Sequence, residues 1–181
     1  MTRPGLTSAP TGSVAGVATE YRVVAADQTR LAEVGPLFKG MVQHHRALTA
    51  DQLPVRTDDE AWRRRRREYE AWLSGGRAWL LLAVPAAAPH QAAAGYALVR
   101  LTGPGPTWDL GEEVGELESL AVAGPARGHG VGTMLLDAAR ELLRARGVGF
   151  WSVAVVEGNA AARLYERSGF RPFIRELFGP V

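Results

Sequence analysis

A strand, a glycine-rich turn, a helix and a second strand follow one another between Val114 and Val156, and this order limits the possible folds most. The strand-like run "VGELESLAV" leads into "GPARGHGVGT", in which four of ten residues are glycine. An amphipathic stretch follows and ends at Gly147, and Val148–Val156 is apolar again. The sequence therefore predicts a βαβ unit with two parallel strands and a right-handed crossover. The apolar stripe of its helix comprises Val131, Met134, Leu135, Ala138, Leu142 and Ala145.

Other elements are predicted on both sides of this unit. Before it, we expect a strand at Tyr21–Ala25, a helix that Asp27 caps and that Pro36 kinks or splits on its way to Gln43, and a helix that Asp58 or Asp59 caps and Gly75 ends. The runs "RAWLLLAVP" and "AAAGYALVRLTG" predict two antiparallel strands. After the unit, Asn159 caps a short helix that Gly169 ends, and "FRPFIRELF" predicts a final strand.

Length and composition favour a single domain. Residues 1–19 mix Gly, Pro, Ser, Thr and Ala without periodicity and predict a flexible tail, so the domain is expected at residues 20–181. The chain has no cysteine, which excludes disulfides and a thiolate nucleophile, and no Cys/His pattern of a metal site. It shows no signal peptide and no apolar run of membrane-spanning length. We expect a cytoplasmic protein, a monomer or homodimer, with no membrane partner and no metal.

Two clusters of titratable residues on the first helices carry no clear function. Arg63–Arg67 suggests nucleic-acid binding, but five consecutive helical residues span more than one turn, and the formal net charge of the chain is only +2. We interpret this run as a solvated face and expect no nucleic-acid partner. His44 and His45 would point about 100° apart on a helix, so they do not chelate a metal as an i, i+4 pair does. They are interpreted as helix-end or pocket-wall residues.

The strand at Val114–Val122 contains an internal conflict. Strict alternation puts Glu116 and Glu118 on the same face as Leu120, and Leu117 on the other. A β-bulge between Leu117 and Leu120 would let both leucines face the core. Such a bulge also leaves backbone N–H groups unpaired, as happens beside active sites.

The glycine-rich turn does not match the common nucleotide-binding loops. A Walker A loop ends in Gly-Lys-Ser/Thr, and no lysine lies near this turn. A dinucleotide fingerprint needs G-x-G-x-x-G, whereas Gly128, Gly130 and Gly132 form G-x-G-x-G. Bare backbone beside Arg127 and a helix N-terminus instead predicts a cradle for an anion.

Two motifs resemble the GCN5-related N-acetyltransferase (GNAT) superfamily. Arg127, Gly130 and Gly132 match its R/Q-x-x-G-x-G/A signature. The stretch "NAAARLYERSGF" is similar to its N-x-x-A-x-x-L-Y-x-x-x-G-F segment and is one residue shorter between Ala162 and Leu164. The motifs cover roughly residues 114–172. The resemblance implies a mixed α/β fold: a mostly antiparallel twisted sheet with a central parallel βαβ unit and helices on both faces. It also implies acetyl-CoA as the acyl donor.

The resemblance further implies roles for individual residues. Backbone amides of the turn would hold the pyrophosphate, and the strand end would pair with the pantetheine arm. Tyr165 would donate a proton to the CoA thiolate; otherwise it is a packing tyrosine. Either Glu116 or Glu118 would accept the proton of the amine, or both only bind substrate or solvent. The implied acetyl-CoA contacts are Leu120, Ala121, Val122, Arg127, Gly128, His129, Gly130, Val131, Gly132, Thr133, Asn159, Ala162 and Tyr165.

These observations predict an N-acetyltransferase that moves an acetyl group from acetyl-CoA to a primary amine of a small molecule or peptide. Because the chain has no cysteine to carry an acyl group, direct transfer in a ternary complex is expected. The helices between Asp27 and Ser74 and the loop "GPGPTWDL" would contact the acceptor, and neither is diagnostic. Two alternatives remain: a non-catalytic acyl-CoA-binding module and an arginine-helix nucleic-acid binder, which would show steep salt dependence.

Overall fold

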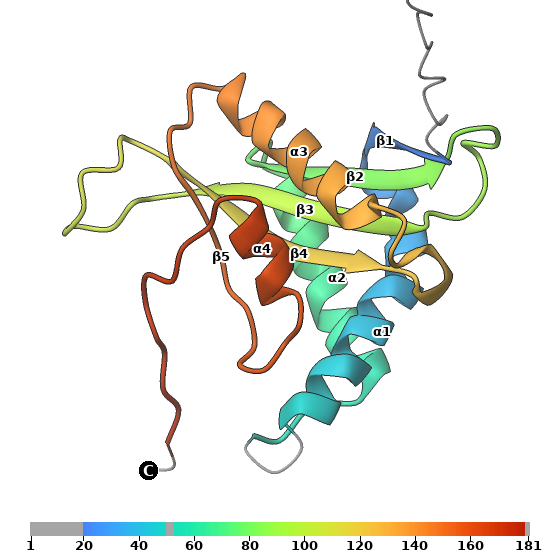
Figure 1. Cartoon of the computed structure of the whole chain (residues 1–181), viewed down its shortest axis with the longest axis horizontal. Helices are drawn as coiled ribbons and strands as arrows, with labels where there is room; N and C mark the ends of the chain where they lie inside the picture. The colour runs from blue at the N-terminus through green and yellow to red at the C-terminus, as the bar shows by residue number, and fades with distance from the viewer. Residues whose placement is uncertain (1–19, 50–52, 180–181) are drawn as a thin grey trace, which may run out of the picture.

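The five strands of the described chain form one sheet in sequence order. The computed structural model describes residues 20–49 and 53–179, so the expected tail at residues 1–19 lies outside them. The strands are β1 (Tyr21–Ala26), β2 (Ala78–Pro85), β3 (Gly95–Thr102), β4 (Val114–Val122) and β5 (Trp151–Val153) (Figure 1). Strands β1 to β4 pair antiparallel, and β5 pairs parallel with β4. This mixed, mostly antiparallel sheet confirms the predicted fold class.

Helices cover both faces of the sheet. One face carries α1 (Leu31–Thr49) and α2 (Asp58–Ser74), and the other carries α3 (Val131–Arg144) and α4 (Ala162–Arg167) (Figure 1). Alternate residues of β2 and β3 point into two separate cores, as the two-residue period of a strand requires. The core under α1 and α2 includes Leu31, Val34, Phe38, Tyr69, Leu80, Leu82, Tyr96 and Leu98, and the core under α3 includes Leu81, Val99, Leu117, Val131, Leu135, Leu136, Leu143 and Tyr165.

The first two helices differ from expectation in their details. Of the kink or split predicted at Pro36, the split is wrong: α1 continues through Pro36, after a 3₁₀ turn capped by Asp27. Proline has no N–H to donate to the carbonyl one turn earlier in the helix. Because Pro36 is exposed, water can bind that carbonyl instead. The cap of α2 is Thr57 rather than an aspartate, because the Thr57 hydroxyl accepts the Glu60 N–H. No helix in the described ranges is long and apolar enough to cross a membrane.

The chain after α3 is less regular than predicted. Strand β5 covers three residues instead of Val148–Val156, since it pairs with β4 only opposite Gly115–Leu117. The predicted strand in "FRPFIRELF" is wrong as well: within the described chain, residues 170–179 adopt no strand and lie mostly exposed. A strand needs a neighbour for its backbone hydrogen bonds, and β5 offers only three residues. Asn159 caps the turn that leads into α4, since its side chain accepts the Ala161 N–H.

The bulge predicted in β4 is confirmed. Leu98 pairs with Ser119 and Val99 with Leu117, so Glu118 has no counterpart on β3. Leu117 and Leu120 consequently both contact the core under α3, although they are three residues apart. The bulge turns Glu118 and Ser119 toward α2, where Arg65 and Tyr69 meet them.

Candidate active site

The edge of β4 beyond the bulge is open toward β5. The parallel ladder ends at the pair Leu117 and Val153, whereas β4 continues to Val122. Ala123 N–H bonds the Ala94 carbonyl on the β3 side, and Arg127 Nε donates to the Val122 carbonyl from the opposite side. Because backbone groups alternate along a strand, the N–H groups of Leu120 and Val122 point toward the open edge. This edge can accept an extended ligand in the manner of an added strand.

The glycine-rich turn places uncapped N–H groups beside that edge. Gly128 and Gly130 have φ values of 81° and 78°, a left-handed conformation that favours glycine. Gly130 is the N-cap of α3 and offers no side chain, so the N–H groups of the first turn, Val131 to Thr133, lack a partner within the helix. A Cβ at Gly128 or Gly130 would meet nothing within 4 Å, so the backbone is accessible. The positive end of α3 therefore suits a phosphate group.

Three other residues of the turn have more specific environments. Gly132 serves packing, because a Cβ there would lie 2.9 Å from Leu164 Cδ2 on α4. The Arg127 side chain is exposed and lies 3.1 Å from the Val122 carbonyl through its Nε, which leaves its terminal nitrogens available to an anion. His129 is exposed, with Nδ1 3.4 Å from Glu20 Oε2.

Tyr165 lies in the core between α4, α3 and β4. The residue is 8% exposed, and its ring packs edge-on against Phe170, with the ring centroids 5.9 Å apart. Burial raises the pKa of the phenol, so the hydroxyl remains protonated at neutral pH. A protonated hydroxyl with a small exposed fraction can serve as a proton donor to a ligand that reaches it.

Asn159 and His45 meet, although 114 residues separate them in sequence. Asn159 Oδ1 accepts the Ala161 N–H at 2.9 Å, so its Nδ2 faces His45 Nε2, at 3.4 Å. An amide nitrogen donates, which requires an unprotonated Nε2 on the half-buried imidazole of α1. Burial, and secondly the nearby His44, lower the pKa of His45. The structure thus adds an imidazole at the end of α1 to the neighbourhood of the motif residue Asn159.

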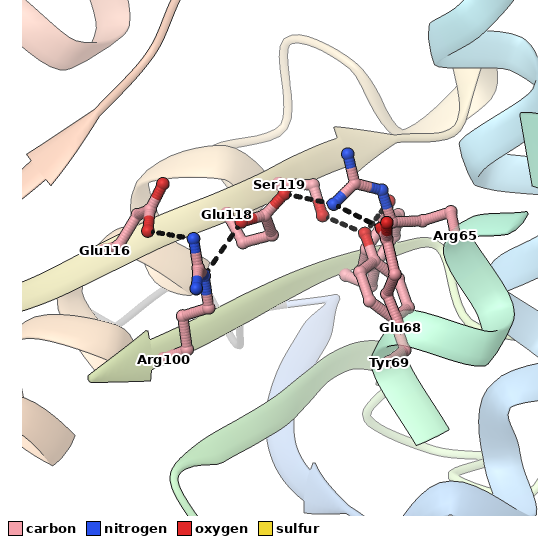
Figure 2. Close-up of polar contacts among 8 residues, drawn as sticks. Arg65, Glu68, Tyr69, Arg100, Glu116, Glu118 and Ser119 are labelled. Carbon is pink, nitrogen blue, oxygen red and sulfur yellow. Dashed lines mark hydrogen bonds and ion pairs between the residues drawn. The ribbon is translucent and has the colours of Figure 1, made fainter. Parts of the chain in front are cut away.

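Glu116 and Glu118 face α2 and differ in their partners. Arg100 from β3 bonds both: its Nη2 lies 2.5 Å from Glu116 Oε2 and its Nε 3.0 Å from Glu118 Oε2. Arg65 from α2 bonds Glu118 as well, as Figure 2 shows. The side chain of Glu118 is 10% exposed and that of Glu116 is 29% exposed. Glu118 is therefore held between two guanidinium groups, whereas Glu116 has one partner and remains accessible.

The pKa of Glu116 is raised above its usual value. Burial is the main cause and the charge of Glu118 adds to it, while Arg100 and Arg65 act in the opposite direction. A carboxylate with a raised pKa is a better proton acceptor than an ordinary surface glutamate.

Beside Glu118, a buried hydroxyl cluster holds the bulge against α2. The Tyr69 hydroxyl hydrogen-bonds Ser119 and lies 3.4 Å from the Tyr96 hydroxyl. Burial raises the pKa of both tyrosines, Tyr69 most strongly, so both phenols stay neutral. Among the described residues, every fully buried side-chain polar atom has a partner. The cluster therefore anchors the bulge without leaving an unpaired polar group.

Several residues near the site were not identified from the sequence. Arg65 was interpreted as part of a solvated run, and its neighbours Arg64 and Arg66 do pair along α2, with Glu60 and Glu70. Arg65 instead lies on the buried side, four residues before the core residue Tyr69, and this i, i+4 relation was the available signal. Arg100 and Ser119 had no such signal, because their partners are distant in sequence. His45 is predicted at a helix end or pocket wall, but its distant partner Asn159 is not predictable from the sequence.

Comparisons with known proteins identify the family and the fold of this chain. Residues 45–170 match the sequence model of the acetyltransferase (GNAT) family. A GCN5-related N-acetyltransferase from Ralstonia eutropha superposes with a TM-score of 0.71 at 18% identity, over 89% of this chain and 98% of the other. A predicted acetyltransferase from Clostridium acetobutylicum, solved with acetyl-CoA, gives a TM-score of 0.67 at 14% identity, over 88% of this chain and 96% of the other.

One curated relative is similar over a shorter region. The mycothiol acetyltransferase of Beutenbergia cavernae is 49% identical over 59 residues, which are 32% of this chain. The match spans only 20% of that relative's length. The family match, in contrast, covers more than half of this chain and includes β4, the glycine-rich turn, α3 and α4. This chain belongs to the acetyltransferase (GNAT) family.

Proposed function

We propose that this protein transfers an acetyl group from acetyl-CoA to a primary amine of a small molecule or peptide, by direct attack in a ternary complex. The observation that carries the proposal is the open edge of β4 directly beside the uncapped N-terminus of α3. The extended, amide-containing pantetheine arm of acetyl-CoA suits the open strand edge, and its pyrophosphate suits the N-terminus of the helix. Bound acetyl-CoA supplies the activated thioester.

The proposed donor contacts follow from this arrangement. The N–H groups of the first turn of α3, with Gly128 and Gly130, hold the pyrophosphate, and Arg127 adds positive charge. His129 and Ala162 are proposed as further contacts of acetyl-CoA, and Asn159 is proposed to bind its pantetheine arm. On β4, the backbone of Leu120, Ala121 and Val122 lines the pantetheine arm, and the N–H of Leu120, which points toward the open edge, stabilises the oxyanion that develops during attack.

Proton transfer is assigned to Glu116 and Tyr165. Of the two strand glutamates, Glu116 is the proposed base, since Glu118 is held by Arg65 and Arg100. Tyr165 is the proposed acid for the departing thiolate. The two groups lie on opposite faces of the sheet, because Glu116 faces α2 and Tyr165 belongs to the core under α3. A substrate pair bound at the open edge between β4 and β5 can contact both faces.

The partial similarity to a mycothiol acetyltransferase supports acetyl transfer and does not identify the acceptor here. Acceptor contacts are proposed for the helices α1 and α2, whose residues already meet the site through His45 and Arg65.

The test is release of free CoA thiol from acetyl-CoA across a panel of amines. We expect turnover with at least one amine, and a loss of about 10²- to 10⁴-fold in kcat for Tyr165→Phe with unchanged acetyl-CoA affinity. Tyr21→Phe on β1, whose ring contacts the same core, is the matched control and should keep full activity. Acetyl-CoA binding without turnover on any amine would favour the non-catalytic binding module. A failure to bind acetyl-CoA in calorimetry would refute the proposal.

A further inference from the structure

Five charged side chains of alternating sign form a continuous chain of ion pairs that ends at Glu116. From α2 inward they are Glu68, Arg65, Glu118, Arg100 and Glu116, and we call them the charge ladder (Figure 2). Arg65 Nη1 lies 3.1 Å from Glu68 Oε2, and the same guanidinium bonds Glu118. The ladder thus connects the surface of α2 with the two glutamates of β4 across the bulge.

The ladder is held in a fixed geometry by Trp72. The guanidinium carbon of Arg100 lies 4.6 Å from the centroid of the Trp72 ring, and that of Arg65 lies 5.7 Å from it. Trp72 packs against the core under α1 and α2. A guanidinium stacked on a partly buried ring loses orientational freedom, so each arginine is kept between its two carboxylates.

We propose that the charge ladder sets how tightly Glu116 holds its proton, and that Arg65, Glu118 and Arg100 are positioning residues for this base. The proposal rests on the function proposed above only in calling Glu116 the base. Arg100 is the decisive member because it is shared: its Nη2 bonds Glu116 while its Nε bonds Glu118, so one positive charge serves both carboxylates.

Each member of the ladder then has an effect of predictable sign on Glu116. The charged groups that face Glu116 are Arg100 from β3, Glu118 from β4 and Arg65 from α2. Removing the negative charge of Glu118 relieves repulsion and frees Arg100, so ionised Glu116 becomes more stable. Removing the positive charge of Arg100 or Arg65 makes ionised Glu116 less stable, with the smaller effect for Arg65 because it touches Glu118 and not Glu116.

The experiment measures Glu116 directly and through catalysis. A ¹³C NMR titration of the Glu116 carboxyl, assigned by its loss in Glu116→Gln, gives the midpoint in each variant without reference to turnover. We expect the midpoint to fall by about half a pH unit or more in Glu118→Gln and to rise by a similar amount in Arg100→Gln. The acid limb of kcat/KM should move in the same directions, since activity falls as the base is protonated.

Controls separate a charge effect from a folding defect. Glu70→Gln removes a carboxylate that pairs with Arg66 at 2.8 Å on the same helix, outside the ladder, and should leave the midpoint unchanged. If Arg100→Gln does not fold, Arg65→Gln tests the same sign at a side chain that bonds Glu118 and not Glu116. If the ladder residues had a merely structural role, their variants would lose stability or activity, but the Glu116 midpoint would not shift in opposite directions in Glu118→Gln and Arg100→Gln.

Two outcomes are distinguishable. Midpoints that stay unchanged, or that move in one direction for both charge types, would overturn the ladder proposal. Midpoints that move as expected while the acid limb of kcat/KM stays in place would confirm the ladder and refute Glu116 as the base.

Discussion

Substitution of Gly115 by alanine tests the packing of the βαβ unit beside the proposed base. Gly115 on β4 is buried and bonds the Phe150 carbonyl through its N–H at 2.9 Å. An added Cβ would lie 2.5 Å from Leu143 Cδ1, 2.9 Å from Leu143 Cδ2 and 3.0 Å from Trp151 Cβ. Since carbon atoms pack at about 3.5 to 4.0 Å, α3 or β5 must move by about 1 Å.

The magnitude follows from the surroundings of the clash. Leu143 is 3% exposed and Trp151 Cβ is attached to the paired backbone of β5, so neither atom moves freely. We expect Gly115→Ala to lower the free energy of unfolding by about 1 to 3 kcal/mol, as overpacked cores do. Leu143→Ala alone should cost about 2 to 5 kcal/mol through the cavity it leaves.

The double variant is the sharper measurement. In Gly115→Ala/Leu143→Ala the new methyl group fills part of the space that the leucine vacated. We therefore expect the double variant to lose about 1 kcal/mol less unfolding free energy than the two single variants lose together, or better. Urea unfolding followed by tryptophan fluorescence measures all three variants. Gly149→Ala, where a Cβ would meet nothing within 4 Å, is the control and should change stability by less than about 0.5 kcal/mol. Additive effects within about 0.5 kcal/mol would show that Leu143 does not pack on Gly115.

Two further predictions concern the glycine-rich turn and α1. Gly130→Ala places a side chain at a φ of 78°, so unfolding free energy should fall by about 1 to 2 kcal/mol and calorimetry should show weaker CoA binding; unchanged stability would contradict the left-handed cap. For His45, a lowered pKa means that the unfolded chain binds the proton more tightly, so stability should decline as pH falls below about 6.5. His45→Gln should remove the part of this stability loss that is due to His45, measured by urea unfolding at several pH values. If the variant and the wild type have the same pH profile, His45 does not contribute to the loss.

The arrangement of the βαβ unit was predictable because its signals are local. Periodicity identified α3, and the conflict among Glu116, Leu117 and Leu120 predicted the bulge before any pairing was known. Motif residues located the glycine-rich turn in the same way, since helix caps and left-handed glycines depend on neighbours within a few residues.

Other predictions failed where pairing partners decide the structure. The apolar character of Val148–Val156 and of "FRPFIRELF" predicted strands, yet β5 has three residues and residues 170–179 carry no strand in the described chain. A strand forms only where a neighbouring edge accepts its hydrogen bonds, which apolar content alone does not specify. Pro36 similarly remained within α1 because its exposed position tolerates a missing hydrogen bond.

The sequence by itself determined the family resemblance, the order of the elements in the βαβ unit and the position of the glycine-rich turn, because each rests on residues close together in the chain. Only the tertiary structure decided which glutamate is free. Glu116 and Glu118 have the same ionisable group two residues apart, and they differ because Arg65 from α2 and Arg100 from β3 meet at the bulge. Charge interactions act through space, so these long-range neighbours, and not the local sequence, distinguish the two carboxylates.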